Sequence, residues 1–210
     1  MYILVNSKQV KSYENECLKI LHLAQAKLRK EQKITFEIRM VGSGAKRIVT
    51  QNGKNGAFDL DFNLVLRKIP KKFSKNLLLL KRTIRQVIDQ VIPKDYSNGK
   101  DSTSVITYVK TSDTGASFHF DIGILRINNQ NKLERLVYKN QTKSTLVWNQ
   151  IFYSNDLNRK AKVIRRRNAF NQVKKRYVYL KNKALKQQIE ASSYSLYFQD
   201  RSAGIPAHTF

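Results

Sequence analysis

Two alternating apolar–polar runs, joined by a glycine-rich turn, constrain the fold of this chain more than any other feature. Residues 34–40 alternate with a period of two, which is typical of a half-buried β-strand. Residues 58–64 alternate in the same way, so the pattern predicts a second strand after the turn. The apolar face of this second run carries Phe58, Leu60, Phe62 and Leu64, and its polar face carries Asp59, Asp61 and Asn63.

The spacing of Asp59 and Asp61 indicates a cation site. Residues two apart on a strand have Cα atoms roughly 6.5–7 Å apart on the same side, so their side-chain oxygens can converge on one or two divalent cations. The structural alternative is a pair of solvent-facing aspartates on a half-exposed sheet. Aspartate is disfavoured in strands, however, and Asp59, Asp61 and Asp121 all lie within strongly apolar runs, which favours the metal interpretation.

The turn between the two runs is suited to phosphate. It reads Gly42-Ser43-Gly44, and a short segment that can form a helix follows it. Exposed backbone N–H groups and a serine hydroxyl at such a turn match the acceptor oxygens of a phosphate. Farther along the chain, Asp121 stands in a third alternating run, residues 117–124, with apolar residues on the opposite face. The sequence therefore combines a predicted phosphate site with three carboxylates on predicted strands.

In this order, Gly42-Ser43, the short helical turn, Asp59-x-Asp61 and Asp121 resemble the signature of the polymerase-beta-type nucleotidyltransferase superfamily. The resemblance covers residues 34–125, and the long polar spacer at residues 50–56 departs from the family pattern. It implies an α+β fold in which a mixed β-sheet carries helices on one face. The order strand, strand, helix, strand, strand, which periodicity alone predicts, favours the same architecture.

The resemblance also implies an enzyme that moves a nucleoside monophosphate from a nucleoside triphosphate, such as ATP, to a hydroxyl acceptor. Two Mg²⁺ or Mn²⁺ ions would stabilise the attacking and leaving oxygens, and Mg²⁺ prefers oxygen ligands. The implied catalytic and metal-binding residues are Asp59 and Asp61 for both ions, and Asp121 for the acceptor-side ion and the hydroxyl proton. The implied nucleotide-binding residues are Gly42 and Ser43 for the β- and γ-phosphates, with Lys46 or Arg47 adding positive charge.

The charge of the chain predicts a polyanionic partner. Forty Lys and Arg against 15 Asp and Glu give a net charge of +25, and surfaces built only for solubility usually mix both signs. Between Asp156 and Glu190 there are twelve Lys or Arg and no acidic residue, on apolar spacing typical of a helix. Contact with a polyanion is favoured there over a solvated face or a membrane-surface helix. The predicted nucleic-acid-binding residues are Arg165, Arg166, Arg167, Lys174 and Lys175.

Periodicity divides the chain into a core, residues 1–152, and a basic helical C-terminal region, residues 153–210. Residues 1–10 fit a strand or a loose arm, and residues 95–102 are expected to form a loop. The remaining core elements expected are helices at 12–30 and 73–92, and strands at 104–110, 133–138 and 145–151.

Cysteine usage and hydropathy favour a cytoplasmic protein. The single cysteine, Cys17, cannot form an intramolecular disulfide, and it lies on the apolar stripe of the first predicted helix. We therefore expect Cys17 in the core rather than as a nucleophile. No stretch approaches 18 consecutive apolar residues and no signal peptide is evident, so no membrane association is expected.

Four function classes follow, in order of preference. The first is nucleotide transfer to an RNA end such as that of tRNA, and the second is synthesis of a cyclic or linear oligonucleotide second messenger. Transfer to a small-molecule antibiotic is disfavoured, because a chain of charge +25 repels cationic drugs. A non-catalytic nucleic-acid-binding module would be supported by loss of a core carboxylate, and none of the three is missing.

Overall fold

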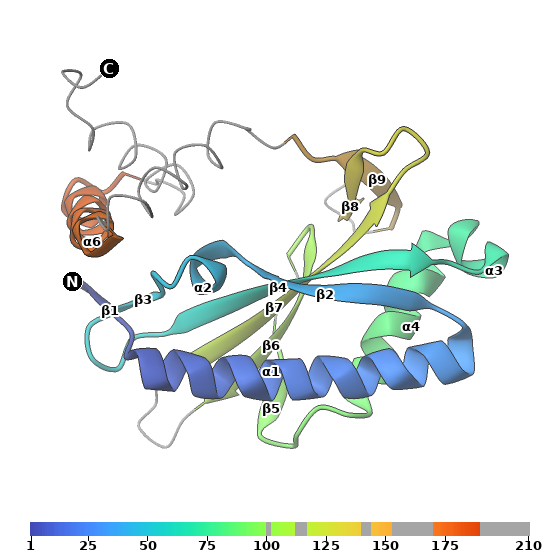
Figure 1. The fold of residues 1–210 in the computed structure, drawn as a ribbon, viewed down its shortest axis with the longest axis horizontal. Helices are drawn as coiled ribbons and strands as arrows, with labels where there is room; N and C mark the ends of the chain where they lie inside the picture. Colours follow the sequence, from blue (N-terminus) through green and yellow to red (C-terminus); the bar gives the residue numbers. More distant parts are fainter. Residues whose placement is uncertain (100–101, 112–116, 140–143, 153–169, 190–210) are drawn as a thin grey trace.

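A mixed β-sheet forms the centre of the molecule in a computed structural model, which describes residues 1–99, 102–111, 117–139, 144–152 and 170–189 (Figure 1). The strand order is β2-β4-β7-β6-β5, and β8 pairs with β7 and with β9. Strands β4 and β7 run parallel, whereas the other pairs are antiparallel, so the predicted mixed sheet is confirmed. The strands are β2 (Thr35–Val41), β4 (Phe58–Lys68), β5 (Tyr96–Asn98), β6 (Val105–Thr111), β7 (Ser117–Ile127), β8 (Leu133–Tyr138) and β9 (Leu146–Gln150).

Asparagine caps set the boundaries of the main helices. Helix α1 (Ser7–Lys27) begins earlier than expected, because the side chain of Asn6 accepts a hydrogen bond from the backbone N–H of Lys8. A π-helical turn, η1 (Leu28–Gln32), extends it. The single helix expected at 73–92 is wrong: the structure has α3 (Lys71–Ser74) and α4 (Leu77–Asp89). Asn76 separates them, since it takes an extended conformation and accepts from the N–H of Leu79.

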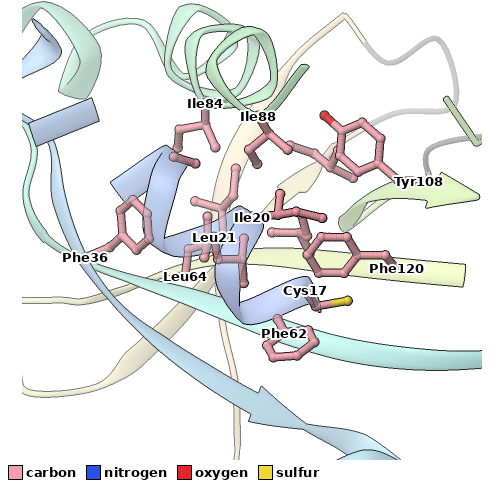
Figure 2. Close-up of a cluster of buried hydrophobic side chains, with 14 of the residues drawn as sticks. Cys17, Ile20, Leu21, Phe36, Phe62, Leu64, Ile84, Ile88, Tyr108 and Phe120 are labelled. Carbon is pink, nitrogen blue, oxygen red and sulfur yellow. The ribbon is translucent and has the colours of Figure 1, made fainter. Parts of the chain in front are cut away.

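Helices α1 and α4 cover one face of the sheet, as predicted (Figures 1 and 2). Cys17 lies in this core with no solvent exposure, and burial raises the pKa of its thiol well above the usual range. The rings of Phe62 and Phe120, from the two parallel strands, meet edge to face with centroids 5.5 Å apart. Figure 2 shows the side chains that fill this layer, among them Ile20, Leu21, Leu64, Ile84, Ile88 and Tyr108. The other face of β4 and β7 carries Asp59, Asp61 and Asp121, and farther along the strands the buried Val65 and Leu125.

A second, smaller unit joins the two ends of the described chain. Strand β1 (Tyr2–Leu4) pairs antiparallel with β3 (Thr50–Asn52), which resolves the choice between a strand and an arm at the N-terminus. Helix α6 (Phe170–Lys186) packs beside them (Figure 1). Asn182 accepts from the N–H of Tyr2 at 2.6 Å and donates to the Tyr2 carbonyl at 3.0 Å. Val173, Tyr177 and Ala184 of α6 are buried with Ile48.

Two expectations meet the structure only in part. Residues 96–98, expected in a loop, form the edge strand β5 beside β6, because Tyr96 is buried against the core. Of the predicted nucleic-acid-binding residues, Lys174 and Lys175 lie on α6, half-buried and exposed respectively, whereas Arg165, Arg166 and Arg167 lie outside the described residues. None of the helices in the described ranges is long and apolar enough to cross a membrane.

Candidate active site

The sheet brings the three aspartates of the sequence pattern together. Asp61 on β4 and Asp121 on β7 are register partners across the parallel pair, and Asp59 is paired with His119. Paired residues of neighbouring strands project from the same face, so all three carboxylates lie on the face opposite the core of Figure 2. Thr107 of β6, the register partner of Asp121 on its other side, donates a hydrogen bond from Oγ1 to Asp121 Oδ1 at 2.7 Å.

The pKa of Asp61 reflects the negative charges gathered around it. Burial, and then the charges of Asp59 and Asp121, raise the pKa of Asp61 to about 6, while Arg135 and Lys46 act to lower it. A divalent cation between the carboxylates would oppose this shift, and carboxylate oxygens are the ligands that Mg²⁺ prefers. Within the described ranges, no three His, Cys, Asp or Glu side chains are already arranged as a metal-binding group. Mg²⁺ keeps several waters and needs few protein ligands, so an open set of aspartates fits it.

The predicted phosphate turn lies directly against Asp61. Val41, the last residue of β2, is the register partner of Asp61, and the short helix α2 (Gly42–Ala45) begins immediately after it. Gly42 has φ +63°, and a Cβ built at this position would overlap Asp61 Oδ2. Only glycine combines this backbone conformation with so close an approach. The turn closes through the N–H of Ile48, which donates to the carbonyl of Ser43 at 3.0 Å.

The two cations predicted near the turn have different surroundings. Lys46 is half-buried, and its charge acts on Asp61. Arg47 is exposed and has φ +55°, a left-handed conformation at the end of the turn. Ser43 is half-buried within α2. The structure therefore brings Gly42 and Lys46 to the carboxylates, and it places Ser43 in the same turn.

Helix α6 supplies a cation that sequence reasoning did not single out. The ammonium of Lys181 donates to Thr50 Oγ1 at 2.8 Å and lies 4.5 Å from the centroid of the Tyr2 ring. Burial lowers the pKa of Lys181, and the nearby charge of Asp59 partly offsets this effect. Lys181 was one of twelve bases in an unbroken basic segment. Only the packing of α6 on β1 and β3 distinguishes it from the others.

Strand β8 supplies a second unpredicted cation, Arg135, whose charge also acts on Asp61. Thr107 and Arg135 both lie in runs that were predicted as strands. The alternation of such a run could have assigned them to a face, but it carries no information about which strand lies beside them. The site thus consists of three carboxylates, a glycine turn that carries Lys46, and cations from two further elements, α6 and β8. Such a set can bind a polyphosphate together with divalent metal ions.

Similarity of this chain to known proteins is found among solved structures. No family model matches the chain, and no curated protein matches it. Solved structures do match. Vibrio cholerae DncV cyclic AMP-GMP synthase, in complex with a linear intermediate, superposes with a TM-score of 0.60 at 10% identity, over 97% of this chain and 70% of that one.

Two further solved structures agree. The STING-associated CdnE c-di-GMP synthase from Capnocytophaga granulosa matches with a TM-score of 0.57 at 16% identity, over 97% of this chain and 62% of that chain. CdnC from E. coli, in a structure with ATP, matches with a TM-score of 0.55 at 13% identity, over 96% of this chain and 62% of that chain. The chain thus shares its fold with the CD-NTase and cGAS-like enzymes, which are members of the polymerase-beta-type nucleotidyltransferase superfamily.

Proposed function

We propose that this protein is a metal-dependent nucleotidyltransferase that joins nucleoside triphosphates into a linear or cyclic oligonucleotide. The observation that carries the proposal is the register of Asp61 and Asp121 across β4 and β7, with the Gly42 turn against Asp61. The matched fold supports it, because solved proteins with this fold include a cyclic AMP-GMP synthase and a c-di-GMP synthase. Since the chain spans 62–70% of the lengths of the three matched proteins, the reaction of those whole enzymes is itself part of the proposal.

Each residue has a role in this mechanism. Asp59, Asp61 and Asp121 would hold the divalent ions through their carboxylate oxygens. When bound, the ions stabilise the charge that develops on the attacking and leaving oxygens. Asp121, oriented by Thr107, accepts the proton of the attacking hydroxyl.

The turn and the surrounding cations hold the triphosphate. The backbone N–H groups of Gly42 and Ser43 bind the β- and γ-phosphates, where the close approach of the chain requires glycine. Lys46, whose charge acts on Asp61, and Lys181, which the charge of Asp59 reaches, add positive charge for the triphosphate. Arg47, which is exposed, contributes only long-range attraction.

An RNA end is the second candidate acceptor. The net charge of +25 favours it, since a nucleotide alone does not require so large a field. The three arginines on which that prediction chiefly depends, Arg165, Arg166 and Arg167, lie outside the described residues.

One experiment separates the two candidates. The protein is incubated with radiolabelled ATP, CTP, GTP and UTP, singly and in pairs, with Mg²⁺ or Mn²⁺, in the presence and absence of total RNA. We expect labelled oligonucleotides and pyrophosphate without RNA, and none from the variant Asp59→Asn/Asp61→Asn. Label that appears only in RNA would establish the second candidate. No product under any condition would contradict both.

A further inference from the structure

Arg135 occupies the centre of the β7-β8-β9 extension, on the side of the sheet that carries the carboxylates. Its register partners are Leu125 on β7 and Asn149 on β9. Leu125 alternates with Gly123 and Asp121 on β7, so all three project from one face. Paired residues of antiparallel strands share a face, and Arg135 therefore lies on the same face as Asp121.

The side chain of Arg135 has an unused hydrogen-bond donor. Its Nε is buried and has no hydrogen-bond partner among the residues that the structure describes. Leaving a buried donor unpaired is costly, and each such group calls for an explanation. The neighbouring Arg126 shows the usual arrangement: its Nε donates to Glu134 at 2.7 Å, and its guanidinium lies 4.6 Å from the centroid of the Trp148 ring.

Arg135 lies on a different side of the site from Lys46 and Lys181. Lys46 belongs to the turn after β2, and Lys181 hydrogen-bonds Thr50 and acts on Asp59. Arg135 instead comes from β8, which pairs with β7 at residues 125–127, beyond Asp121 in the strand direction. Its charge nevertheless reaches Asp61. The turn and α6 thus surround the side assigned to the triphosphate donor, and Arg135 lies on the side of Asp121, which is assigned to the acceptor.

We propose that Arg135 binds the 5′-phosphate of an acceptor nucleotide and so selects nucleotides as acceptors. This inference rests on the proposed function. A guanidinium presents N–H groups in a planar fork that matches two phosphate oxygens. Three carboxylates repel an incoming phosphate, and a positive charge beside them offsets that repulsion. The acceptor bound in this way has its sugar hydroxyl free to face Asp121.

The reaction then balances as follows. The acceptor hydroxyl oxygen attacks the α-phosphorus of the donor and forms a new P–O bond. The bond from that phosphorus to the oxygen bridging the β-phosphate breaks, and pyrophosphate leaves with the electron pair. The hydroxyl proton passes to Asp121. Arg135 takes no part in these bond changes, so its removal should weaken acceptor binding more than turnover.

The test uses substrates that can play only one role. A 2′,3′-dideoxynucleoside triphosphate has no sugar hydroxyl and can only donate, whereas a nucleoside or a nucleoside 5′-monophosphate can only accept. We expect the wild-type KM to be at least about tenfold lower for the monophosphate than for the nucleoside, which is the effect of one modest charge-assisted contact. Arg135→Gln should abolish this preference by raising the KM for the monophosphate by a larger factor than the KM for the donor triphosphate. Arg135→Lys, which keeps the positive charge but loses the planar guanidinium, should retain part of the preference for the monophosphate.

Lys132→Gln is the matched control. Lys132 is exposed immediately before β8, so the variant removes one positive charge from the same hairpin. Lys132→Gln should leave the ratio of the KM for the nucleoside to the KM for the monophosphate unchanged. A rise of the donor and acceptor KM by equal factors in Arg135→Gln would show that Arg135 only balances the carboxylates, and it would overturn the inference. Loss of base preference with an intact phosphate preference would overturn it too, because Arg135 would then contact the base.

A binding measurement separates failure of this inference from failure of the proposed function. Equilibrium titration of wild type and Arg135→Gln with a nucleoside and its 5′-monophosphate needs no turnover. If wild type makes no product, the proposed function fails, and the titration alone decides the role of Arg135. A monophosphate preference that is equal in both proteins would exclude the phosphate contact.

Discussion

Asp61 of β4 and Asp121 of β7 face each other in register across a parallel strand pair, although α3, α4, β5 and β6 lie between them in the sequence. Parallel neighbours need a crossover connection, and here that crossover includes α4, one of the two helices that cover the opposite face. Packing of the core therefore determines the separation of the two carboxylates. The same packing turns both carboxylates to the other face of the sheet, where the Gly42 turn lies against Asp61.

Replacement of any of the three aspartates by asparagine should abolish product formation while the protein stays folded. Loss of one metal-ligand charge removes several kcal/mol of transition-state stabilisation, which corresponds to a decrease in kcat of about 10³-fold or more. Product formation by Asp59→Asn, Asp61→Asn and Asp121→Asn is measured together with circular dichroism. Glu31→Gln, on η1, is the control and should retain wild-type activity. Near-normal turnover in any of the three would remove that residue from the mechanism.

In the absence of metal ions, Asp61 should make the free energy of unfolding depend on pH. Its folded-state pKa of about 6 lies above the ordinary value of 3.8, so the folded protein holds a proton that the unfolded chain releases. Between about pH 4 and 6 the free energy of unfolding should therefore fall as pH rises, by about 2–3 kcal/mol in total. Denaturant unfolding in EDTA across this range measures it. Asp61→Asn should be more stable than wild type at pH 7 and should lose most of this dependence.

Added Mg²⁺ or Mn²⁺ should offset the loss of stability that the charged carboxylates cause at pH 7. Mn²⁺ or Mg²⁺ that binds the carboxylates stabilises the folded state, and this stabilisation rises with the logarithm of the ion concentration above Kd. We expect both ions to raise the melting temperature of the wild type at pH 7 and to leave that of Asp59→Asn/Asp61→Asn unchanged. Equal increases in both proteins would place the ion elsewhere.

Gly42→Ala should damage both the fold and the site. The variant combines a left-handed φ with overlap between the new Cβ and Asp61 Oδ2, and strain of this kind costs about 1–3 kcal/mol. Gly53→Ala is a matched control, because Gly53 has φ +73° and a Cβ there has no neighbour within 4 Å. Gly42→Ala should therefore lose more activity than Gly53→Ala. Equal losses would show that close approach to Asp61 is not required.

Lys181→Gln should raise the KM for the donor triphosphate, because it removes the cation that α6 places near Asp59. An effect of about 3- to 30-fold is expected for one charge-assisted contact to phosphate. Ser43→Ala should act more weakly on the same KM, since the backbone donors of the turn remain. Lys183→Gln, an exposed change on the same helix, is the control. A lower kcat with an unchanged KM would exclude a role for Lys181 in donor binding.

If the basic segment contacts RNA, the affinity for RNA should fall as the salt concentration rises. Replacement of Arg165, Arg166 and Arg167 by Gln should make this dependence weaker. Each phosphate neutralised on a single strand contributes about −0.7 to the slope of log affinity against log salt. RNA affinity across a salt series, for wild type and variant, measures both slopes. Identical slopes would leave the basic segment without a role in binding RNA.

Local pattern was enough for most of the sheet strands and for the faces of their residues. Period-two alternation assigned Asp59, Asp61 and Asp121 to the polar faces of strands, and the structure has strands at all three positions. A turn was expected at residues 42–44 before a short helix, whereas in the structure Gly42 has a left-handed φ and is itself the first residue of α2. The caps were harder to predict: Asn6 starts α1 earlier than apolar spacing predicted, and Asn76 separates two helices that apolar spacing merged.

The sequence by itself determined which residues share a face, since the geometry of a strand or a helix depends only on neighbouring residues. Only the tertiary structure decided which faces meet. The pairing of β4 with β7, the approach of Lys181 to Asp59 and the position of Arg135 on β8 all join residues from distant parts of the chain. Such contacts depend on how the core of α1, α4 and the sheet packs, and alternation along one strand carries no information about its partner.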